Sequence, residues 1–149
     1  MRNVVLLGPP GAGKGTIAVR VAKEAGLLHL STGDVLRDEV ARGTELGQRA
    51  RTFMERGELV PDAVVLAMVQ ERVKGQQGVL LDGFPRTLAQ AEGLAEFLPV
   101  HVVVNLAVTK DEVVRRLGSR RVCRACGAVY NVVTQRPRTE GLCDRCGGE

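Results

Sequence analysis

The sequence predicts an α/β fold built on a parallel, doubly wound β-sheet. Four short apolar runs, at residues 4–7, 27–30, 79–82 and 101–106, predict strands, and the runs at 4–7 and 79–82 have the composition of buried strands. The segments between them are long and carry helical periodicity, which favours right-handed crossover helices over hairpins. With 149 residues and 44% hydrophobic content, the chain can form one globular domain; its core must be aliphatic, because aromatic residues make up only 3%.

A glycine-rich turn follows the first predicted strand. Residues 8–16 read GPPGAGKGT, and a helix is expected from about residue 13 to residue 25, ending at Gly26. A strand, a glycine-rich turn and a helix N-terminus in this order form a phosphate cradle, in which backbone N–H groups and the helix dipole attract an anion. Lys14 would reach the outer phosphates, while Gly15 stands where the common pattern has Ser or Thr.

Residues 27–60 are expected to form a short strand and two helices. Ser31 and Asp34 have capping-box spacing, so we place helices at 35–41 and 45–56, the second ending at Gly57. Both helices are rich in charge and poor in apolar residues, which predicts a small, partly exposed subdomain rather than a layer on the sheet. His29 is interpreted as a partly buried strand residue.

Three further helices are predicted between residues 61 and 120. Pro61 introduces a helix at 62–74, and the pairs Thr87 with Gln90 and Thr109 with Glu112 indicate capping boxes for helices ending near residues 97 and 120. The strand at 79–82 ends in Asp82. This carboxylate is therefore expected at the carboxyl edge of the sheet, where ligands bind in open α/β folds.

Four cysteines mark the C-terminal region. They form two Cys-x2-Cys pairs with sixteen residues between them, around a predicted strand at 129–133. No export signal or membrane segment is evident, so we expect a reducing cytoplasm, in which such a set binds zinc rather than forming disulfides. The predicted metal ligands are Cys123, Cys126, Cys143 and Cys146.

The positive charge is concentrated near the C-terminus. The chain has a net charge of +4, and residues 115–149 hold eight arginines against three acidic residues. This end should seek an anion, either nucleic acid or a small phosphorylated ligand.

Taken together, these motifs resemble bacterial adenylate kinases with a zinc-containing lid. The matching stretches are the turn at 8–16, STGDVLR at 31–37, residues 57–60, LDGFPR at 81–86, residues 116–121 and the four cysteines. The resemblance implies a three-layer P-loop kinase fold with strand order 2-3-1-4, the family's fifth strand being missing. It divides the chain into a core (1–30 and 61–119), an AMP-binding arm (31–60) and an incomplete lid (120–149).

The resemblance also implies the site residues. Catalytic roles would fall to Lys14, Arg86, Arg120 and Asp82, with Asp82 orienting Mg²⁺ through water. ATP would be bound by Gly11, Ala12, Gly13, Lys14, Gly15, Thr16, Arg116, Arg120, Val129 and Tyr130. AMP would be bound by Thr32, Arg37, Glu58, Leu59, Val60, Gly83, Phe84, Pro85, Arg86 and Gln90, with a candidate cis peptide between Phe84 and Pro85.

The implied reaction is reversible phosphoryl transfer from MgATP to AMP. It needs many positive donors and water exclusion rather than a covalent nucleophile. We expect ATP, AMP and ADP as partners, a monomer, and neither nucleic acid nor membrane. Because the family continues past residue 149, reduced activity is also expected. The alternatives are a UMP or CMP kinase, which Thr32 disfavours, and a zinc-ribbon module that binds nucleic acid, which the scarcity of aromatic residues disfavours.

Overall fold

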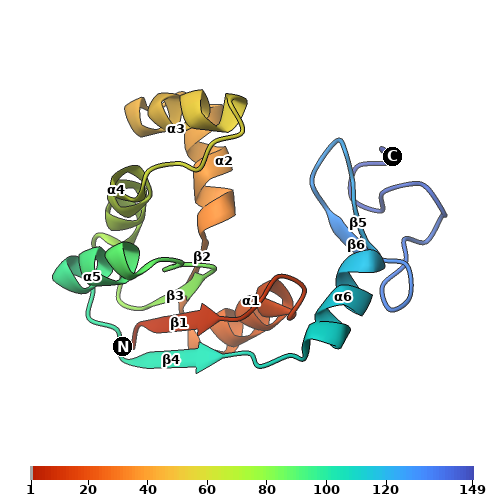
Figure 1. Cartoon of the computed structure of the whole chain (residues 1–149), viewed down its shortest axis with the longest axis horizontal. Helices are drawn as coiled ribbons and strands as arrows, with labels where there is room; N and C mark the ends of the chain where they lie inside the picture. Colours follow the sequence, from red (N-terminus) through yellow and green to blue (C-terminus); the bar gives the residue numbers. More distant parts are fainter. Residues whose placement is uncertain (1) are drawn as a thin grey trace. The chain divides into compact units, whose positions relative to one another are not determined.

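The structure, a computed structural model, describes residues 2–149 as two compact units (Figure 1). The first unit holds the chain up to Gly8 together with Gly13–Leu106, and the second holds Pro9–Ala12 and Ala107–Glu149. Each unit has its own sheet and is described separately.

The first unit is built on a four-stranded parallel sheet. Its strands are β1 (Val4–Leu7), β2 (Leu28–Ser31), β3 (Val79–Asp82) and β4 (Val102–Asn105). They lie in the order β2-β3-β1-β4, so the predicted order is confirmed. The register pairs Leu6 with Asp82, and Ser31 with Asp82, which brings the carboxyl ends of β1, β2 and β3 to one edge.

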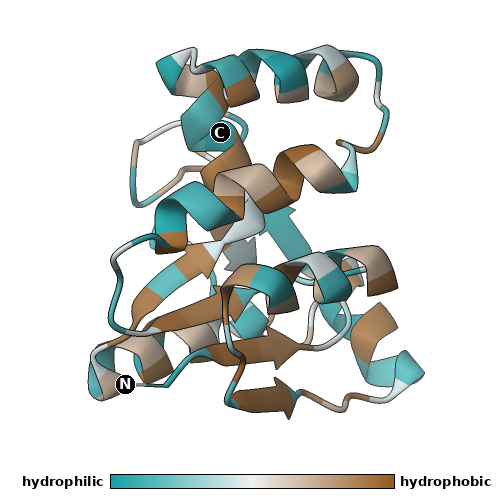
Figure 2. Cartoon of the chain, turned by 90° about the vertical axis from the view of Figure 1, so that its left-hand side faces the viewer, coloured by the Kyte–Doolittle hydropathy of each residue, from teal (hydrophilic) through white to brown (hydrophobic). Residues whose placement is uncertain are grey.

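Five helices belong to this unit. They are α1 (Lys14–Ala25), α2 (Thr32–Arg42), α3 (Glu45–Glu55), α4 (Asp62–Val73) and α5 (Leu88–Phe97). Alternate strand residues face opposite sides. Leu6 and Leu80 pack with Ala18 and Ala22 of α1, whereas Val5 and Leu81 belong to a larger cluster with α4 and α5. The result is three layers, with the most hydrophobic ribbon in the strands (Figure 2).

The strand β4 forms an open edge of the sheet. It pairs only with β1, and 58% of Val103 and 39% of Val104 is exposed. The uncovered edge on the fourth strand is thus present in the structure. At the opposite end of these strands, Asn3 donates to the Pro99 carbonyl and accepts from the Val79 N–H.

The helices α2 and α3 pack on each other and on α4. Val35 of α2 and Ala50 of α3 are buried in the same cluster as α4. At the crossing of α2 and α3, a Cβ on Gly47 would lie 2.0 Å from the Glu39 carbonyl oxygen, so only glycine permits this approach.

A buried ion-pair network also joins α2 to α4. Glu39 is 3% exposed and accepts from Arg72 Nη2 at 2.7 Å and from Thr44 Oγ1 at 2.5 Å. Arg72 also pairs with Asp38. The Thr44 and Arg72 hydrogen bonds hold the pKa of Glu39 below its ordinary value. Apolar and ionic contacts therefore hold α2 and α3 against α4.

Of the three predicted capping boxes, two are confirmed at their N-cap residue, whereas the Gln90 side chain bonds Arg86 and Asp62, and the Glu112 side chain bonds Arg115 and Arg116. Thr87 accepts the Gln90 N–H at 3.1 Å, and Thr109 accepts the Glu112 N–H at 3.4 Å. The Ser31 signal is wrong in detail, because its side chain makes no capping bond and α2 already begins at Thr32. Asp34 instead pairs with Arg37 at 2.5 Å. Pro61 precedes α4 as its N-cap.

The second unit contains one helix and a two-stranded ribbon. Helix α6 (Lys110–Gly118) is followed by β5 (Arg120–Val122), which pairs antiparallel with β6 (Val129–Asn131). The sequence placed residue 120 at the end of the helix; it lies in β5, because the chain leaves α6 at Ser119 to pair with β6. Across residues 2–149, we find no helix of the length and apolarity needed to cross a membrane.

Candidate functional site

A cavity of about 290 Å³ opens in the first unit, at the carboxyl edge of the sheet. It lies where β3 passes into the turn before α5 and where α2 and α4 begin. Eight of the ten residues predicted to bind AMP line it: Thr32, Glu58, Leu59, Val60, Gly83, Phe84, Arg86 and Gln90. Five more lining residues were not predicted: Gly33, Leu36, Asp62, Val65 and Thr87. Residues from three segments that are distant in sequence, 32–36, 58–65 and 83–90, therefore meet at one cavity.

Polar groups in the cavity are held by short hydrogen bonds. Gln90 is buried; its Oε1 accepts the Arg86 N–H at 2.7 Å and its Nε2 donates to Asp62 Oδ1 at 2.7 Å. Arg86 Nε donates to the Gly83 carbonyl at 2.7 Å, which bends this side chain over its own turn. The turn also contains the cis peptide bond expected between Phe84 and Pro85.

Two residues predicted to bind AMP do not line the cavity. Pro85 follows Phe84 in the turn but is not part of the wall. The Arg37 guanidinium is paired with Asp34 on the exposed side of α2, and both side chains are about two-thirds exposed. The Asp34 carboxylate thus holds Arg37, which sequence spacing alone did not indicate.

The glycine-rich turn leads into α1. Gly13 is the N-cap of this helix with φ 88°, a left-handed conformation that favours glycine. The N-cap residue Gly13 makes no side-chain capping hydrogen bond, and the N-terminus of a helix attracts anions. Lys14 Nζ donates to the Gly8 carbonyl at 2.8 Å, so the lysine arches back over the turn. In the second unit, Arg116 Nη1 donates to the Gly11 and Ala12 carbonyls at 3.4 Å.

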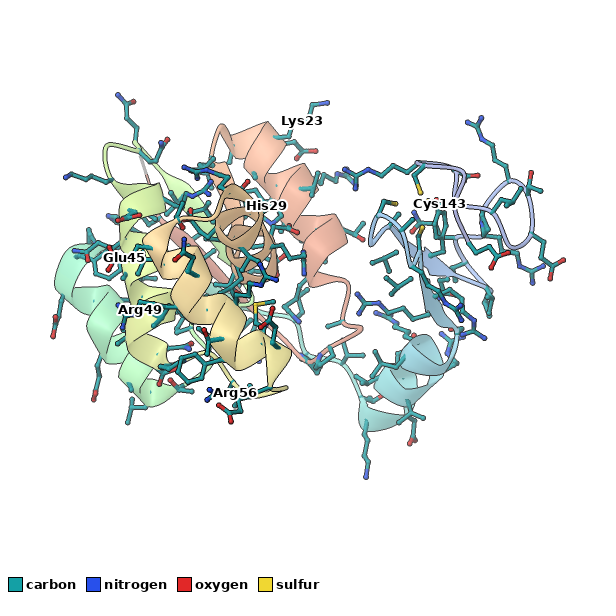
Figure 3. All side chains as sticks on the ribbon, turned by 90° about the horizontal axis from the view of Figure 1, so that it is seen from above. Lys23, His29, Glu45, Arg49, Arg56 and Cys143 are labelled. Carbon is teal, nitrogen blue, oxygen red and sulfur yellow. The ribbon has the colours of Figure 1, made fainter. Side chains whose placement is uncertain are left out.

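Asp82 stands at the carboxyl end of β3. It is 9% exposed, and a Cβ on Gly15 would lie 3.9 Å from its Oδ2. The same oxygen lies 3.3 Å from His29 Nε2, on the neighbouring strand β2 (Figure 3). His29 is indeed a partly buried strand residue, but its contact with Asp82 was missed. A carboxylate oxygen beside a phosphate turn suits Mg²⁺, which binds one or two carboxylates together with phosphates and water.

The ribbon of the second unit carries three of the residues predicted to contact ATP. Arg120 lies on β5, and Val129 and Tyr130 lie on β6. Arg120 is exposed, whereas Tyr130 is half-buried. Arg116 is held by Glu112, whose carboxylate accepts from Arg116 Nε at 2.6 Å. Arg115 and Arg116 lower the pKa of Glu112 to about 2.

The four cysteines converge in the second unit. Their sulfur atoms all lie within 4.8 Å of one another, with 3.5 Å between Cys123 and Cys146 and 3.6 Å between Cys126 and Cys143. Four thiolates bound to zinc at about 2.3 Å would stand about 3.8 Å apart in a tetrahedron. All four are free thiols. The arrangement therefore fits the predicted tetrahedral zinc site.

Tyr130 joins the ribbon to this cluster. Its hydroxyl oxygen lies 3.3 Å from Cys143 Sγ and accepts the Asp144 N–H at 2.8 Å (Cys143 is labelled in Figure 3). The hydroxyl proton is thus directed to the sulfur. This hydrogen bond is the main cause that lowers the pKa of Cys143 to about 6, which favours the thiolate that a metal requires.

Similarity to known proteins identifies the family of this chain. The sequence profile described as "Adenylate kinase" matches residues 6–145. The chain belongs to the adenylate kinase family. Proteins named adenylate kinase include one from Archaeoglobus fulgidus, 52% identical over 99% of this chain and 71% of its own length. Others come from Carboxydothermus hydrogenoformans, 49% identical (99% and 72%), and Bacillus pumilus, 48% identical (99% and 71%).

Membership of the adenylate kinase family confirms the resemblance drawn from the motifs. It agrees with the three-layer sheet and its strand order, and it favours neither the pyrimidine nucleotide kinase nor the nucleic-acid module. The individual roles of the site residues and the division into core, arm and lid stay predictions.

Proposed function

We propose that this protein transfers a phosphoryl group from MgATP to AMP and forms two molecules of ADP. The observation that carries the proposal is the cavity at the carboxyl edge, where eight of the predicted acceptor residues, from three separate segments, meet in a chain of this family. Such an edge is where open α/β sheets bind their ligands.

The acceptor is assigned to this cavity. Arg86 and Gln90 supply a cation and an amide, and Leu59, Val60 and Val65 supply apolar wall. A phosphate with an attached base needs this combination, because the phosphate demands charge and the flat base demands apolar contact. Arg37 would join the phosphate after exchanging its Asp34 partner, since that ion pair is exposed and weak.

The donor phosphates are assigned to the turn before α1. The N-terminus of α1, which begins at a glycine N-cap, and the Lys14 side chain match an anion with several oxygens. In the second unit, the resemblance assigns ATP contacts to Arg116, Arg120, Val129 and Tyr130. These groups position charge rather than form a covalent bond, which is what phosphoryl transfer between two nucleotides requires.

Two metal ions complete the proposal. Mg²⁺ bound with ATP would neutralise developing charge on the phosphates, and Asp82 would hold its water shell, with His29 fixing one carboxylate oxygen. Zinc would be held by the four cysteines and would have a structural role, because all four ligand positions are filled by protein. A monomer in the cytoplasm, without nucleic acid or membrane partners, stays a prediction.

An assay that couples ADP formation to NADH oxidation tests the activity. Lys14→Met should lower kcat by about 10²-fold or more, because one preorganised phosphate donor is lost. Lys23→Met, on the exposed side of the same helix, is the matched control and should stay within twofold (Figure 3). Equal rates for both variants would contradict the assignment, and a clear preference for UMP over AMP would favour the pyrimidine alternative.

A further inference from the structure

The carboxamide of Gln90 is fixed by one hydrogen-bond donor and one hydrogen-bond acceptor. The Arg86 backbone N–H donates to Oε1 at 2.7 Å, and Asp62 Oδ1 accepts from Nε2 at 2.7 Å. Asp62 is the first residue of α4, and its other oxygen accepts from Thr87 Oγ1 at 3.1 Å. All four residues belong to the first unit and line the same cavity.

These partners allow only one orientation of the amide. A backbone N–H can only donate and a carboxylate can only accept. Turning the Gln90 amide by 180° would set its NH2 against the Arg86 N–H and its oxygen against the Asp62 carboxylate. Because Gln90 is buried, water would not compensate for the two lost bonds.

The fixed amide keeps one free acceptor position and one free donor position. Oε1 retains a second lone pair and Nε2 retains a second N–H. Purine bases differ in the pattern that such a pair can meet. Adenine offers an amino donor next to a ring-nitrogen acceptor, whereas guanine offers a carbonyl acceptor next to a ring N–H donor. The two patterns are opposite, so one amide orientation suits one base and the turned orientation suits the other.

We propose that Asp62 is a specificity-determining positioning residue, which locks the Gln90 amide in the orientation that accepts a 6-aminopurine nucleotide and rejects a 6-oxopurine nucleotide. The inference rests on the proposed assignment of the acceptor to this cavity. Asp62 acts only through Gln90, and no contact of its own with the nucleotide is required. The backbone N–H of Arg86 is the second half of the lock and is present in every side-chain variant.

The test compares acceptors in one assay. For wild type, Asp62→Leu and Asp62→Asn, kcat/KM is measured with AMP and with GMP at saturating MgATP, together with KM for ATP. Asp62→Leu removes an acceptor of a charged hydrogen bond, so the AMP-to-GMP ratio should fall about tenfold or more. Asp62→Asn should restore most of the ratio, because its Oδ1 can still accept from Gln90 Nε2. KM for ATP should not change.

A matched control separates orientation from general damage. Thr87→Val removes the other hydrogen bond to Asp62 and the α5 cap, but it leaves the Gln90 amide with both partners. Whatever its effect on rate, it should keep the AMP-to-GMP ratio of wild type. A wild-type protein that prefers AMP, with an unchanged ratio in Asp62→Leu, would overturn the role of Asp62 alone. A wild-type protein that phosphorylates neither nucleotide, or prefers GMP, would overturn the proposed acceptor as well.

Discussion

The two units of this protein are stabilised by different means. In the first unit, both hydrophobic clusters among the described residues lie on the faces of a four-stranded sheet. In the second unit, helix α6 has no buried residue, and the buried side chains are Ala12 and the two cysteines Cys123 and Cys143. A segment with so little apolar burial needs another source of folding free energy, and a metal bound by four thiolates is such a source. The cavity therefore lies in a unit with two hydrophobic clusters, whereas we expect a metal at the four cysteines to stabilise the ribbon that carries Tyr130.

Removal of a metal bound by the four cysteines should have the largest effect on stability. This effect should be confined to the second unit. Metal binding contributes on the order of 10 kcal/mol to small zinc domains, so a strong chelator, or Cys143→Ser, should unfold the second unit. Hydrogen exchange of the whole protein should show lost protection at β5 and β6 and kept protection at β3. Protection of β5 and β6 that survives chelation would show that the unit folds without metal.

A core truncation should affect the first unit only. Met68 on α4 is 1% exposed, so Met68→Ala should cost about 4 kcal/mol through lost burial and a cavity. Chemical denaturation measures this cost, and zinc content by metal analysis should stay at the wild-type value. The control is Met54→Ala on α3, where the side chain is 43% exposed and the cost should be small. Similar costs at both positions would contradict the packing described for α4.

Loss of the ion pairs between α2 and α4 should give the next largest loss of stability. Arg72→Met leaves the buried Glu39 carboxylate with fewer partners and should cost about 3 kcal/mol at neutral pH. The folded pKa of Glu39 lies below its ordinary value of 4.5, so this stabilisation is complete above that value and is lost as the pH falls through the folded pKa. The difference in the free energy of unfolding between wild type and Arg72→Met should therefore decrease as the pH falls.

Urea titrations at several pH values measure that difference. Arg20→Met is the matched control, because Arg20 forms an exposed pair with Glu24 at 3.1 Å. Its effect should stay below about 0.5 kcal/mol. A pH-independent difference between wild type and Arg72→Met would argue against the role of Glu39.

Loss of the Tyr130 hydroxyl should have the smallest effect, which we expect on the zinc affinity of the second unit. Tyr130→Phe keeps the ring and removes the hydrogen bond to Cys143, so zinc affinity should fall about tenfold. Competition with a chromophoric chelator measures it. Ser119→Ala deletes a hydroxyl in the same unit that bonds only backbone carbonyls and Asn131, so affinity should be unchanged. An unchanged zinc affinity with a raised KM for ATP would instead make the hydroxyl a nucleotide contact.

Sequence reasoning succeeded where local chemistry decides the structure. The apolar runs predicted the strands, and the resemblance predicted their order, because each motif is several residues long. Apolar composition did not separate the buried strand β3 from the largely exposed edge strand β4. The cysteine spacing predicted the cluster, since two residues between ligands fix a tight knuckle. The glycine-rich turn and its helix were also found at the correct place.

Three of the misses share one physical cause, which is contact between residues that are not neighbours in sequence. Asp62 looked like an ordinary first residue of a helix, and only the fold shows that it holds Gln90, 28 positions away. His29 gave no sign of its contact with Asp82, which lies 53 positions away. Arg120, the first residue of β5, was predicted as the end of a helix, because the partner strand β6 lies beyond a cysteine knuckle.

The crossing of α2 and α3 at Gly47 has a consequence for variation. Glycine is the poorest helix former after proline, so propensity alone would favour nearly any other residue at position 47, in the first turn of α3. The Glu39 carbonyl leaves no room for a side chain there. In a library covering every position of α3, position 47 should tolerate glycine alone, while exposed neighbours such as Arg49 accept many residues. The low helix propensity of Gly47 is therefore tolerated, because α2 and α3 can approach each other this closely only at a glycine.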